Sequence, residues 1–403
     1  MAVLVSRQQD YDSEHDWVAL LAQASEYRIA SHHPECWELA MLGLTQCPDH
    51  VKTQFYFELG VVAFYLGLFK EGLEYIDLVL TDPHTTPANY QCSIRNLKFY
   101  IQAIEGKHSV TNITDYYPGL PQAFIGSSLS YAMDSGMLTQ CYRTVNYRML
   151  NGKYIVEATP GCAPDVIHTR NFLVDQISDK DCRVRELICP EWMIPYPSLV
   201  RGLEDVRLFG KRQFTCTSRS HNKLHTAKVC YGEYNRHGIV TILAPVVYQD
   251  EGVHEKNMLP FMLDGHPHVL NLAQEQLLVM KINVELGQLE VVKRVELANC
   301  QMIRGSAGPV PYRHGWLFTV HEGSYDGERC YYHRLVWISN DFTSIKLGRI
   351  FTFTKTAIEF NIGIYIDHQR DQVVLGYSVN DSSSHELRIS GDSPWMPEVG
   401  RSI

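Results

Sequence analysis

The sequence predicts a two-domain protein of the α+β multidomain class: an α-helical domain over residues 1–115, then an all-β propeller over residues 116–403. The chain has 403 residues, more than one hydrophobic core usually serves. Apolar residues recur at helical spacing in the first part, and short runs of Val, Ile, Tyr and Phe between turn residues fill the rest. The pattern changes between residues 106 and 116, which sets the domain boundary.

Helical periodicity is clearest in two segments of the first domain. Residues 35–44 and 54–80 carry apolar side chains at helical spacing, and the second segment stops at Asp82-Pro83. It resembles the tetratricopeptide pattern, in which small residues let two antiparallel helices approach and large residues fill the space between them. The resemblance is carried by Tyr56, Leu59, Gly60, Ala63, Gly67, Phe69, Gly72 and Ile76. A peptide-binding array, a helical cap on the second domain, and a regulatory or oligomerisation module remain open.

The second domain consists of short runs typical of β-strands. Examples are residues 139–150, 206–218, 239–248, 277–284, 316–321, 331–338, 362–366 and 373–379. Gly, Pro, Asn and Asp separate the runs, and no long helical pattern interrupts them. Roughly 280 residues of strand and turn favour a β-propeller of several four-stranded blades, because a sandwich of this length would be unusually large. The runs share no repeated signature, so periodicity leaves the number of blades open.

Composition and charge exclude several classes of function. The formal net charge of −9 argues against a general binder of nucleic acid or of anionic membranes. Residues 1–10 have no apolar core long enough for a signal peptide, and the most apolar window, 61–69, is too short to span a bilayer. We therefore expect a soluble, cytoplasmic protein whose partners are neither nucleic acid nor membrane.

Cysteine, histidine and glycine patterns give no sign of a cofactor. The 11 cysteines are scattered and form no Cys-x-x-Cys pair, which favours reduced, buried thiols over structural zinc. His221 and His225 have metal-ligand spacing, but no carboxylate or thiol lies close by in sequence as a third ligand. No glycine-rich phosphate loop of the nucleotide-binding kinds occurs. We therefore expect no metal and no organic cofactor.

Polar clusters recur beside the apolar strands, about one per expected blade. They are residues 142–147, 202–207, 254–257, 304–306, 321–322, 332–334, 358–361 and 377–381. Each cluster alone has a plain structural explanation, such as an ion pair on a solvated strand. The innermost strands of a propeller converge on a central channel, so together the clusters could line one pocket. Its carboxylates, guanidiniums, ammonium, imidazole and aromatic rings would suit a sugar beside an oxyanion.

The run 202–207, Gly-Leu-Glu-Asp-Val-Arg, is the most informative cluster. In a regular strand Glu204 would face one way, and Asp205 and Arg207 the other. Opposite charges on one face are costly to bury unless they pair or meet a polar ligand. The run resembles the Gly-x-Glu-Asp-Pro-Arg motif of glycoside hydrolase family 130, the β-mannoside phosphorylases and related hydrolases. The order of the flanking motifs agrees over about residues 120–390.

The resemblance implies a five-bladed propeller and inverting chemistry on a β-mannoside. Asp205 matches the family's general acid, a role that needs a carboxyl kept protonated near neutral pH. The candidates for holding an attacking phosphate, the expected co-substrate of a phosphorylase, are Arg143, Arg207, Lys256, His321 and Arg334. The candidates for binding the sugar are Arg143, Asn146, Glu204, Asn257, Tyr377 and Asp381. In the hydrolases of the family carboxylates activate water instead, and Glu322 and Glu359 are the catalytic candidates for that role.

Two departures from the family pattern weaken the expectation of phosphorolysis more than that of the fold. Val206 replaces the usual proline, and Glu322 follows His321 where the phosphorylases have a small residue. The sequence therefore predicts an enzyme that acts on β-mannosides or similar glycosides by phosphorolysis, hydrolysis or glycosyl transfer, with an oligosaccharide or sugar phosphate as ligand. The alternative is a non-catalytic glycan-binding or scaffolding protein that recruits a protein partner through its helices.

Overall fold

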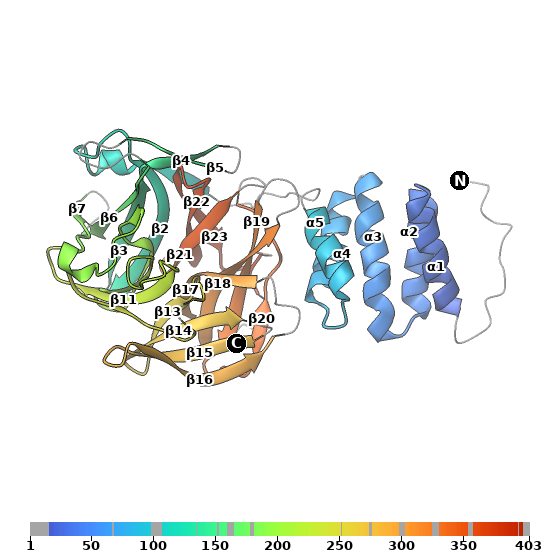
Figure 1. Ribbon diagram of the computed structural model, residues 1–403. Helices are drawn as coiled ribbons and strands as arrows, with labels where there is room; N and C mark the ends of the chain where they lie inside the picture. Colours follow the sequence, from blue (N-terminus) through green and yellow to red (C-terminus); the bar gives the residue numbers. More distant parts are fainter. Residues whose placement is uncertain are drawn as a thin grey trace. The chain divides into compact units, whose positions relative to one another are not determined.

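The computed structural model describes residues 16–66, 68–97, 107–134, 136–150, 153–158, 165–177, 181–250, 252–273, 276–297, 303–324, 330–353, 358–393 and 395–397. Contacts between residues divide the chain into two compact units, Met1–Ile101 and Gln102–Ile403 (Figure 1). We call them the helical unit and the propeller unit, and each has its own hydrophobic core. In the described ranges no helix is long and apolar enough to cross a membrane.

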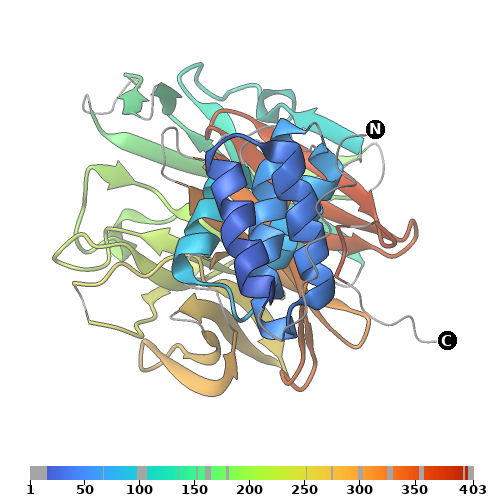
Figure 2. The ribbon, with the colours of Figure 1, turned by 90° about the vertical axis from the view of Figure 1, so that its right-hand side faces the viewer.

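The helical unit consists of antiparallel helices that pack each against the next. They are α1 (Asp16–Ile29), α2 (His33–Gln46), α3 (Lys52–Tyr65), α4 (Phe69–Thr81) and α5 (Pro87–Leu97), with a short 3-10 turn at Asp49–Val51. Figure 2 shows them, in blue, running alongside one another. Leu20, Ala40, Phe55 and Leu59 are fully buried in their core. The helices expected from sequence periodicity are present, while a tetratricopeptide repeat is not established by this arrangement.

Five sheets form the blades of the propeller unit in its described part, each named here from the innermost strand outward. The first blade is β2 (Ile125–Asp134), β3 (Met137–Val145), β6 (Ile167–Gln176) and β7 (Cys182–Glu186). The second is β9 (Glu204–Phe209), β10 (Gln213–Ser218), β11 (Lys228–Tyr234) and β12 (Val240–Pro245). The third is β13 (Leu259–Leu263), β14 (His266–Ala273), β15 (Gln276–Asn283) and β16 (Gln288–Glu296).

The fourth blade is β17 (Ile303–Tyr312), β18 (Gly315–Ser324), β19 (Cys330–Ser339) and β20 (Ile345–Leu347). Strands within each blade pair antiparallel. Among the described residues, three short strands stand outside the four-stranded blades. Strand β8 (Val200–Arg201) pairs parallel with β6 of the first blade, and β4 (Tyr147–Leu150) and β5 (Lys153–Val156) form a separate antiparallel hairpin. Short 3-10 turns occur at Ile113–Asp115 and Glu191–Met193.

The fifth blade closes the ring. It consists of β21 (Glu359–Asp367), β22 (Gln372–Val379) and β23 (Ser384–Ser390), and its outermost strand is β1 (Lys107–Thr111) from the start of the unit. The ladder between β1 and β23 runs from the pair Lys107 and Arg388 to the pair Thr111 and Ser384. The sequence predicts a helical domain up to residue 115, but residues 107–111 belong to the propeller. These residues are mostly polar, which explains why they show no apolar strand pattern.

The innermost strands form a ring in which β2 contacts β9, β9 contacts β13, β13 contacts β17, β17 contacts β21, and β21 contacts β2. The five-bladed propeller implied by the motif resemblance is therefore confirmed. Hydrophobic clusters lie between successive blades: Leu173 of the first blade packs in one cluster with Val206 of the second. These clusters bury the inner strands of the blades, whereas outer strands such as β7 and β16 carry many exposed residues.

Candidate functional site

The backbone at the start of β9 is irregular, and this irregularity positions Asp205. Thr215 pairs with Arg207 and Thr217 pairs with Glu204, so two residues of β9 lie opposite the single residue Cys216. This is a β-bulge, which re-aims the side chains next to it. Asp205 itself has a φ of +50°. The bulge corrects the expectation of strict alternation, because Glu204 and Asp205 both reach the same partner.

Gly202 explains how the chain enters this bulge. Its φ is +91°, a conformation that L side chains rarely adopt. A Cβ at this position would lie 2.2 Å from the carbonyl oxygen of Thr169 in β6. Only glycine therefore fits here, which accounts for the first residue of the motif.

Arg143 of β3 is the common partner of the carboxylates. Its Nη1 donates to Oδ1 of Asp205 at 3.0 Å, and its Nη2 lies 3.7 Å from Oε1 of Glu204. The Arg143 side chain is 6% exposed. Burial opposes its charge, but Tyr147 and the carboxylates of Asp205, Glu204 and Asp381 outweigh that effect and raise its pKa. A buried cation held by several carboxylates ties the first blade to the second.

Asp381 joins this group from the fifth blade. It follows β22 in a turn where Asn380 and Asp381 both have positive φ. Its Oδ2 accepts from the Tyr147 hydroxyl at 3.0 Å, and its Oδ1 accepts from Ser127 Oγ of β2 at 3.2 Å. Burial raises the pKa of Tyr147, and this keeps the hydroxyl a donor. The carboxylates of Glu204, Asp205 and Asp381, with Arg143, are called the carboxylate cluster from here on.

Arg207 contacts two other innermost strands. Its Nε donates to the backbone oxygen of Ser306 in β17 at 3.0 Å, and its guanidinium lies 5.9 Å from the ring centre of Phe360 in β21. Because β21 also contacts β9 directly, the side chain lies where these three innermost strands converge. Its Nη1 donates to the backbone oxygen of Asp205 at 3.2 Å.

The surroundings of Arg207 are unfavourable to its charge. Burial lowers its pKa, Asp205 opposes that shift, and the neighbouring Arg143 adds to it. Its Nη2 is buried, and no described residue accepts a hydrogen bond from it. A buried donor without an acceptor costs free energy until water or a ligand supplies one. Arg207 is therefore suited to hold an anion.

His321 of β18 is connected to Arg207 through Ser306. Its Nδ1 lies 2.8 Å from Ser306 Oγ, and its ring meets Phe360 edge to face at 5.4 Å. His321 and Arg207 thus pack on the same phenylalanine. Of the residues predicted to hold phosphate, Arg143 belongs to the carboxylate cluster, Arg207 contacts the Asp205 backbone, and His321 joins Arg207 through Ser306.

Glu322 and Arg334 form a buried ion pair with each other. Arg334 Nε lies 3.4 Å from Oε1 of Glu322, and each side chain is 2% exposed. Arg334 also donates to the backbone oxygen of Gly348 at 3.4 Å. Glu359, the other carboxylate expected to activate water, is fully buried and accepts from the backbone N–H of Phe353 at 2.7 Å. These three candidates take part in contacts within the fourth and fifth blades.

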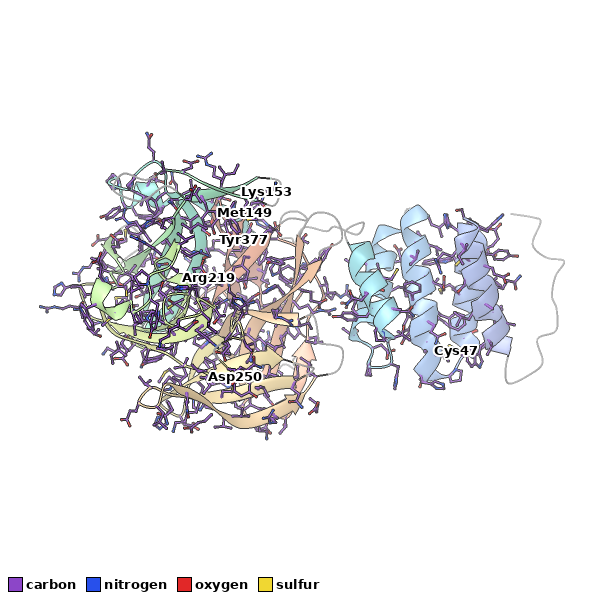
Figure 3. The ribbon with its side chains drawn as sticks, in the orientation of Figure 1. Cys47, Met149, Lys153, Arg219, Asp250 and Tyr377 are labelled. Atoms are coloured by element: carbon purple, nitrogen blue, oxygen red, sulfur yellow. The ribbon has the colours of Figure 1, made fainter. Side chains whose placement is uncertain are left out.

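Tyr377 and Asn146, expected at the sugar, make other contacts. Tyr377, labelled in Figure 3, stacks on Phe353 and His385, and its hydroxyl meets Nδ1 of His108 in the outermost strand β1 at 3.0 Å. The amide of Asn146 donates to the backbone oxygens of Glu157 and Val166 and accepts from the His168 N–H. A ligand would have to displace one of these bonds to use Asn146.

Lys256 and Asn257 lie in the segment before β13. Lys256 is exposed, and Asn257 is half-buried with a φ of +61°. No hydrogen bond or ion pair joins either residue to the carboxylate cluster within the described ranges. The buried charge of this segment belongs to Glu255, whose carboxylate accepts from Lys228 Nζ at 3.0 Å and from the N–H groups of Tyr248 and Gln249. Glu255 therefore anchors the segment.

Three residues of the site were not predicted. Tyr147 and Ser306 belong to the polar clusters 142–147 and 304–306, so the sequence indicates their location but not their roles. Ser127 lies in the run Ile125-Gly126-Ser127-Ser128-Leu129, outside those clusters, and gave no such indication. The structure shows no group of three His, Cys, Asp or Glu side chains placed to hold a metal ion, as far as the described residues go.

No protein-family model and no curated protein matches this sequence. The chain is similar to solved structures that include a β-1,2-mannobiose phosphorylase from Listeria innocua in complex with β-1,2-mannobiose. That likeness has 12% identity and a TM-score of 0.45, and it covers 68% of this chain and 92% of the other. A mannose phosphorylase from Leishmania mexicana in complex with phosphate ion has 10% identity, a TM-score of 0.40 and coverages of 67% and 85%. A family 43 β-xylosidase/α-arabinofuranosidase from a compost metagenome has 9% identity, a TM-score of 0.46 and coverages of 74% and 98%.

Proposed function

We propose that this chain is a carbohydrate-active enzyme that cleaves or forms a glycosidic bond, with Asp205 as the general acid. The observation that carries the proposal is the carboxylate cluster: Glu204, Asp205 and Asp381 come from two blades to one buried guanidinium, that of Arg143. Carboxylates held in place and supported by neighbouring donors are what proton transfer to a leaving sugar oxygen requires.

Asp205 lies at the bulge of the innermost strand β9, and its carboxylate contacts Arg143 of the first blade. In this proposal the carboxyl of Asp205, when protonated, gives its proton to the glycosidic oxygen of the leaving sugar.

Phosphorolysis is the form of the reaction that we propose, with a β-mannoside as substrate and inorganic phosphate as the nucleophile. Support comes from Arg207, whose buried Nη2 has no acceptor among the described residues, and from His321 beside it. Hydrolysis by a water that Glu322 or Glu359 activates has less support, because both carboxylates are engaged in buried contacts.

The test is turnover of β-1,2-mannobiose with and without phosphate. We expect phosphate-dependent release of mannose 1-phosphate, and a loss in kcat of about a hundredfold or more in Asp205→Asn, because general acid catalysis contributes at least that much. Glu290→Gln, an exposed carboxylate of the outer strand β16, is the matched control and should keep full turnover. Release of free mannose alone, whether or not phosphate is present, would favour hydrolysis.

A non-catalytic sugar-binding protein is the competing function. It predicts that the unmutated chain binds mannosides and turns none over on a broad panel of β-glycosides. Retained binding of mannobiose by Asp205→Asn, with turnover lost, would support the enzyme.

We also propose that α3 and α4 form a tetratricopeptide-like pair that serves a protein partner in the cytoplasm. Support comes from Gly60 of α3, where a Cβ would lie 2.9 Å from Cγ1 of Ile76 in α4. The two helices approach closely where the repeat pattern requires a small residue. Gly60→Leu should therefore unfold this pair, seen as a loss of helical circular dichroism, whereas Leu42→Ala at an exposed position of α2 should not.

A further inference from the structure

A cavity of about 200 Å³ lies between the first and second blades. It is lined by the start of β3, the end of β2, the strand β7 and the turns that follow β9 and β11. Asp205 is near the start of β9 and Gly210 follows its end, so a strand rise of about 3.3 Å per residue separates the two by roughly 15 Å. Arg143 is likewise near the end of β3, whereas Met137 and Thr139 of the cavity are near its start. The cavity therefore lies at the opposite end of these strands from the carboxylate cluster.

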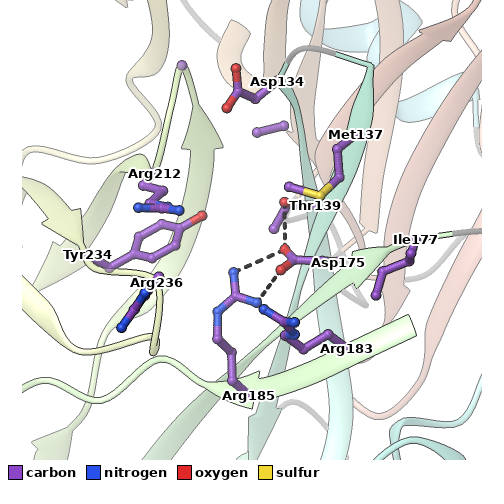
Figure 4. A pocket seen from close by; sticks show the side chains of 12 residues that line it. Asp134, Met137, Thr139, Asp175, Ile177, Arg183, Arg185, Arg212, Tyr234 and Arg236 are labelled. Atoms are coloured by element: carbon purple, nitrogen blue, oxygen red, sulfur yellow. Dashed lines mark hydrogen bonds and ion pairs between the residues drawn. The ribbon is translucent and has the colours of Figure 1, made fainter. Parts of the chain in front are cut away.

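Four guanidiniums from two blades converge on this cavity (Figure 4). Arg183 and Arg185 come from β7 of the first blade, and Arg212 and Arg236 come from turns of the second. The carboxylates in the lining are those of Asp134 and Asp175. In a chain with a net charge of −9, a concave site with more guanidiniums than carboxylates is a marked local reversal of charge.

One of the four arginines is neutralised in place. Arg185 forms a two-pronged ion pair with Asp175, with Nη2 at 3.0 Å from Oδ1. Asp175 also accepts from Thr139 Oγ1 at 2.8 Å. This network is largely buried, with the side chains of Arg185 and Asp175 13% and 9% exposed, and it is part of the cavity lining. Nε of Arg185 is buried and has no hydrogen-bond partner among the described residues.

The other three arginines are exposed at the rim. The structure shows no ion pair between Arg183, Arg212 or Arg236 and a carboxylate of the described residues. Arg236 donates from Nε to Nε2 of its neighbour His237 at 3.0 Å, and this leaves its charge unbalanced. Guanidiniums present a planar fork of donors that matches the oxygens of a phosphate.

The remaining residues of the lining indicate the size and polarity of the ligand that would fit. Gly210 and Ala132 are small residues of the lining, and Tyr234 contributes a ring from the second blade. Met137 and Ile177 supply exposed apolar surface at the edge, 42% and 57% exposed. The volume is below the range of about 300–1,000 Å³ of pockets for drug-sized ligands, so it suits a phosphate with at most a small body attached.

We propose that this inter-blade cavity is a second anion-binding site, one that takes phosphate or a small phosphate ester. The site is separate from the one proposed for catalysis. The proposal therefore holds whichever sugar the central site binds and whichever reaction it performs. Binding is electrostatic, through the exposed guanidiniums of Arg183, Arg212 and Arg236, beside the Asp175–Arg185 pair that neutralises the fourth arginine.

Titration calorimetry of the full chain tests the proposal, with inorganic phosphate, glucose 6-phosphate and uncharged glucose as probes. The combined variant Arg183→Gln, Arg212→Gln and Arg236→Gln should weaken phosphate binding at this site by about tenfold or more, a loss of one to two charge-assisted contacts. The matched control is Lys153→Gln, Lys293→Gln and Arg294→Gln, which removes the same charge from exposed positions elsewhere and should leave the affinity unchanged. Thermal unfolding of both variants checks that the fold is retained.

Two further variants separate this site from the central one. Arg207→Gln should leave binding at the inter-blade cavity intact. Asp134→Asn should tighten that binding by about threefold or more, because it removes a repelling charge, and a variant that merely disturbs folding gives no such gain. Tighter binding of glucose 6-phosphate than of phosphate would identify an ester as the ligand, and the reverse order would identify the free anion.

The proposal is overturned if the unmutated chain binds neither inorganic phosphate nor glucose 6-phosphate at about 10 mM, a concentration at which even a weak phosphate site is occupied. It is equally overturned if the rim variant binds phosphate as tightly as the unmutated chain while Arg207→Gln abolishes binding. In that case the central site holds the anion, and the proposed function would stand without this inference.

Discussion

His333 of β19 is a buried histidine in an aromatic environment. It is fully buried, and its ring lies 4.7 Å from that of Phe353 and 5.9 Å from that of Phe351. Burial lowers its pKa from 6.5 to about 3, although the neighbouring Glu359 backbone opposes the shift. The unfolded chain therefore binds a proton at a pH where the folded chain does not. Stability from this residue is present above the unfolded pKa and is lost as the pH falls from about 6.5 towards 3.

Replacing His333 with phenylalanine should flatten the acid limb of the stability curve. One proton taken up only on unfolding contributes a slope of about 1.4 kcal/mol per pH unit, and His333→Phe removes it. Urea unfolding at pH 7 and pH 5 measures the difference. His237→Phe, at an exposed position, is the control and should leave the slope as it is. Equal slopes for His333→Phe and the unmutated chain would show that another group controls acid stability.

The Glu322–Arg334 pair gives a second prediction about single residues. Removing one partner leaves an uncompensated buried charge, so Arg334→Met should cost about 3–5 kcal/mol of unfolding free energy. The double variant Glu322→Leu, Arg334→Met removes both charges and should regain most of that loss. Turnover retained in the double variant would show that the pair is structural, and turnover abolished while the fold is intact would restore Glu322 to the catalytic candidates.

The carboxylate cluster shows what sequence can predict at this scale. Glu204 and Asp205 stand out in the sequence because buried charges need partners, and Arg143 stands out through the family resemblance. The structure brings the three together. The pairing of Glu322 with Arg334 was not predictable, because it depends on the register of β18 against β19. A single sequence carries no direct record of which residues face each other across two strands.

Among the elements, the bulge in β9 and the strand β1 depart most from a plain strand pattern. Regular alternation would separate Glu204 from Asp205, and the extra residue opposite Cys216 brings them to the same arginine. Glycine at position 202 was a visible sign of an irregular backbone, but the sequence did not show where the extra residue lies. Strand β1 is short, polar and at the outer edge, so the usual signals of burial are absent from it.

Proline substitutions in β1 test its role in closing the ring. As the outermost strand, β1 has N–H groups that alternate between β23 and the solvent. Of the two neighbouring variants Ser109→Pro and Val110→Pro, one should therefore remove a ladder hydrogen bond and cost about 1–2 kcal/mol, and the other should cost much less. Thermal unfolding compares them. Equal effects, large or small, would contradict the pairing of β1 with β23.

At the scale of the whole molecule, the chain is two units with separate cores. The number of blades could not be read from the sequence because the blades share no repeated motif, and ring closure joins residues more than 270 positions apart. The change from helical to strand periodicity is a local pattern, so the sequence predicts the helical unit. The closing strand β1 could not be predicted in this way, because its partner β23 is distant in the sequence.

Separate cores predict separate unfolding. Calorimetry of the full chain should show two heat-absorption peaks, and a shortened chain of residues 107–403 should keep the one that belongs to the propeller. A chain of residues 113–403 lacks β1 and should unfold at a lower temperature. A single peak in the full chain, or its loss in the 107–403 chain, would show that the two units depend on each other.

The seam between β1 and β23 also determines how the propeller responds to force. Lys107, at the beginning of β1, pairs with Arg388, near the end of β23. The point where the chain enters β1 and the point where it leaves β23 therefore lie at the same end of the ladder. Tension applied at these two points would unzip the strands one rung after another, beginning with that pair, instead of loading all rungs at once. We therefore expect the ring to open first at the seam between β1 and β23. A pulling measurement should record a first rupture at low force, from the separation of these two strands.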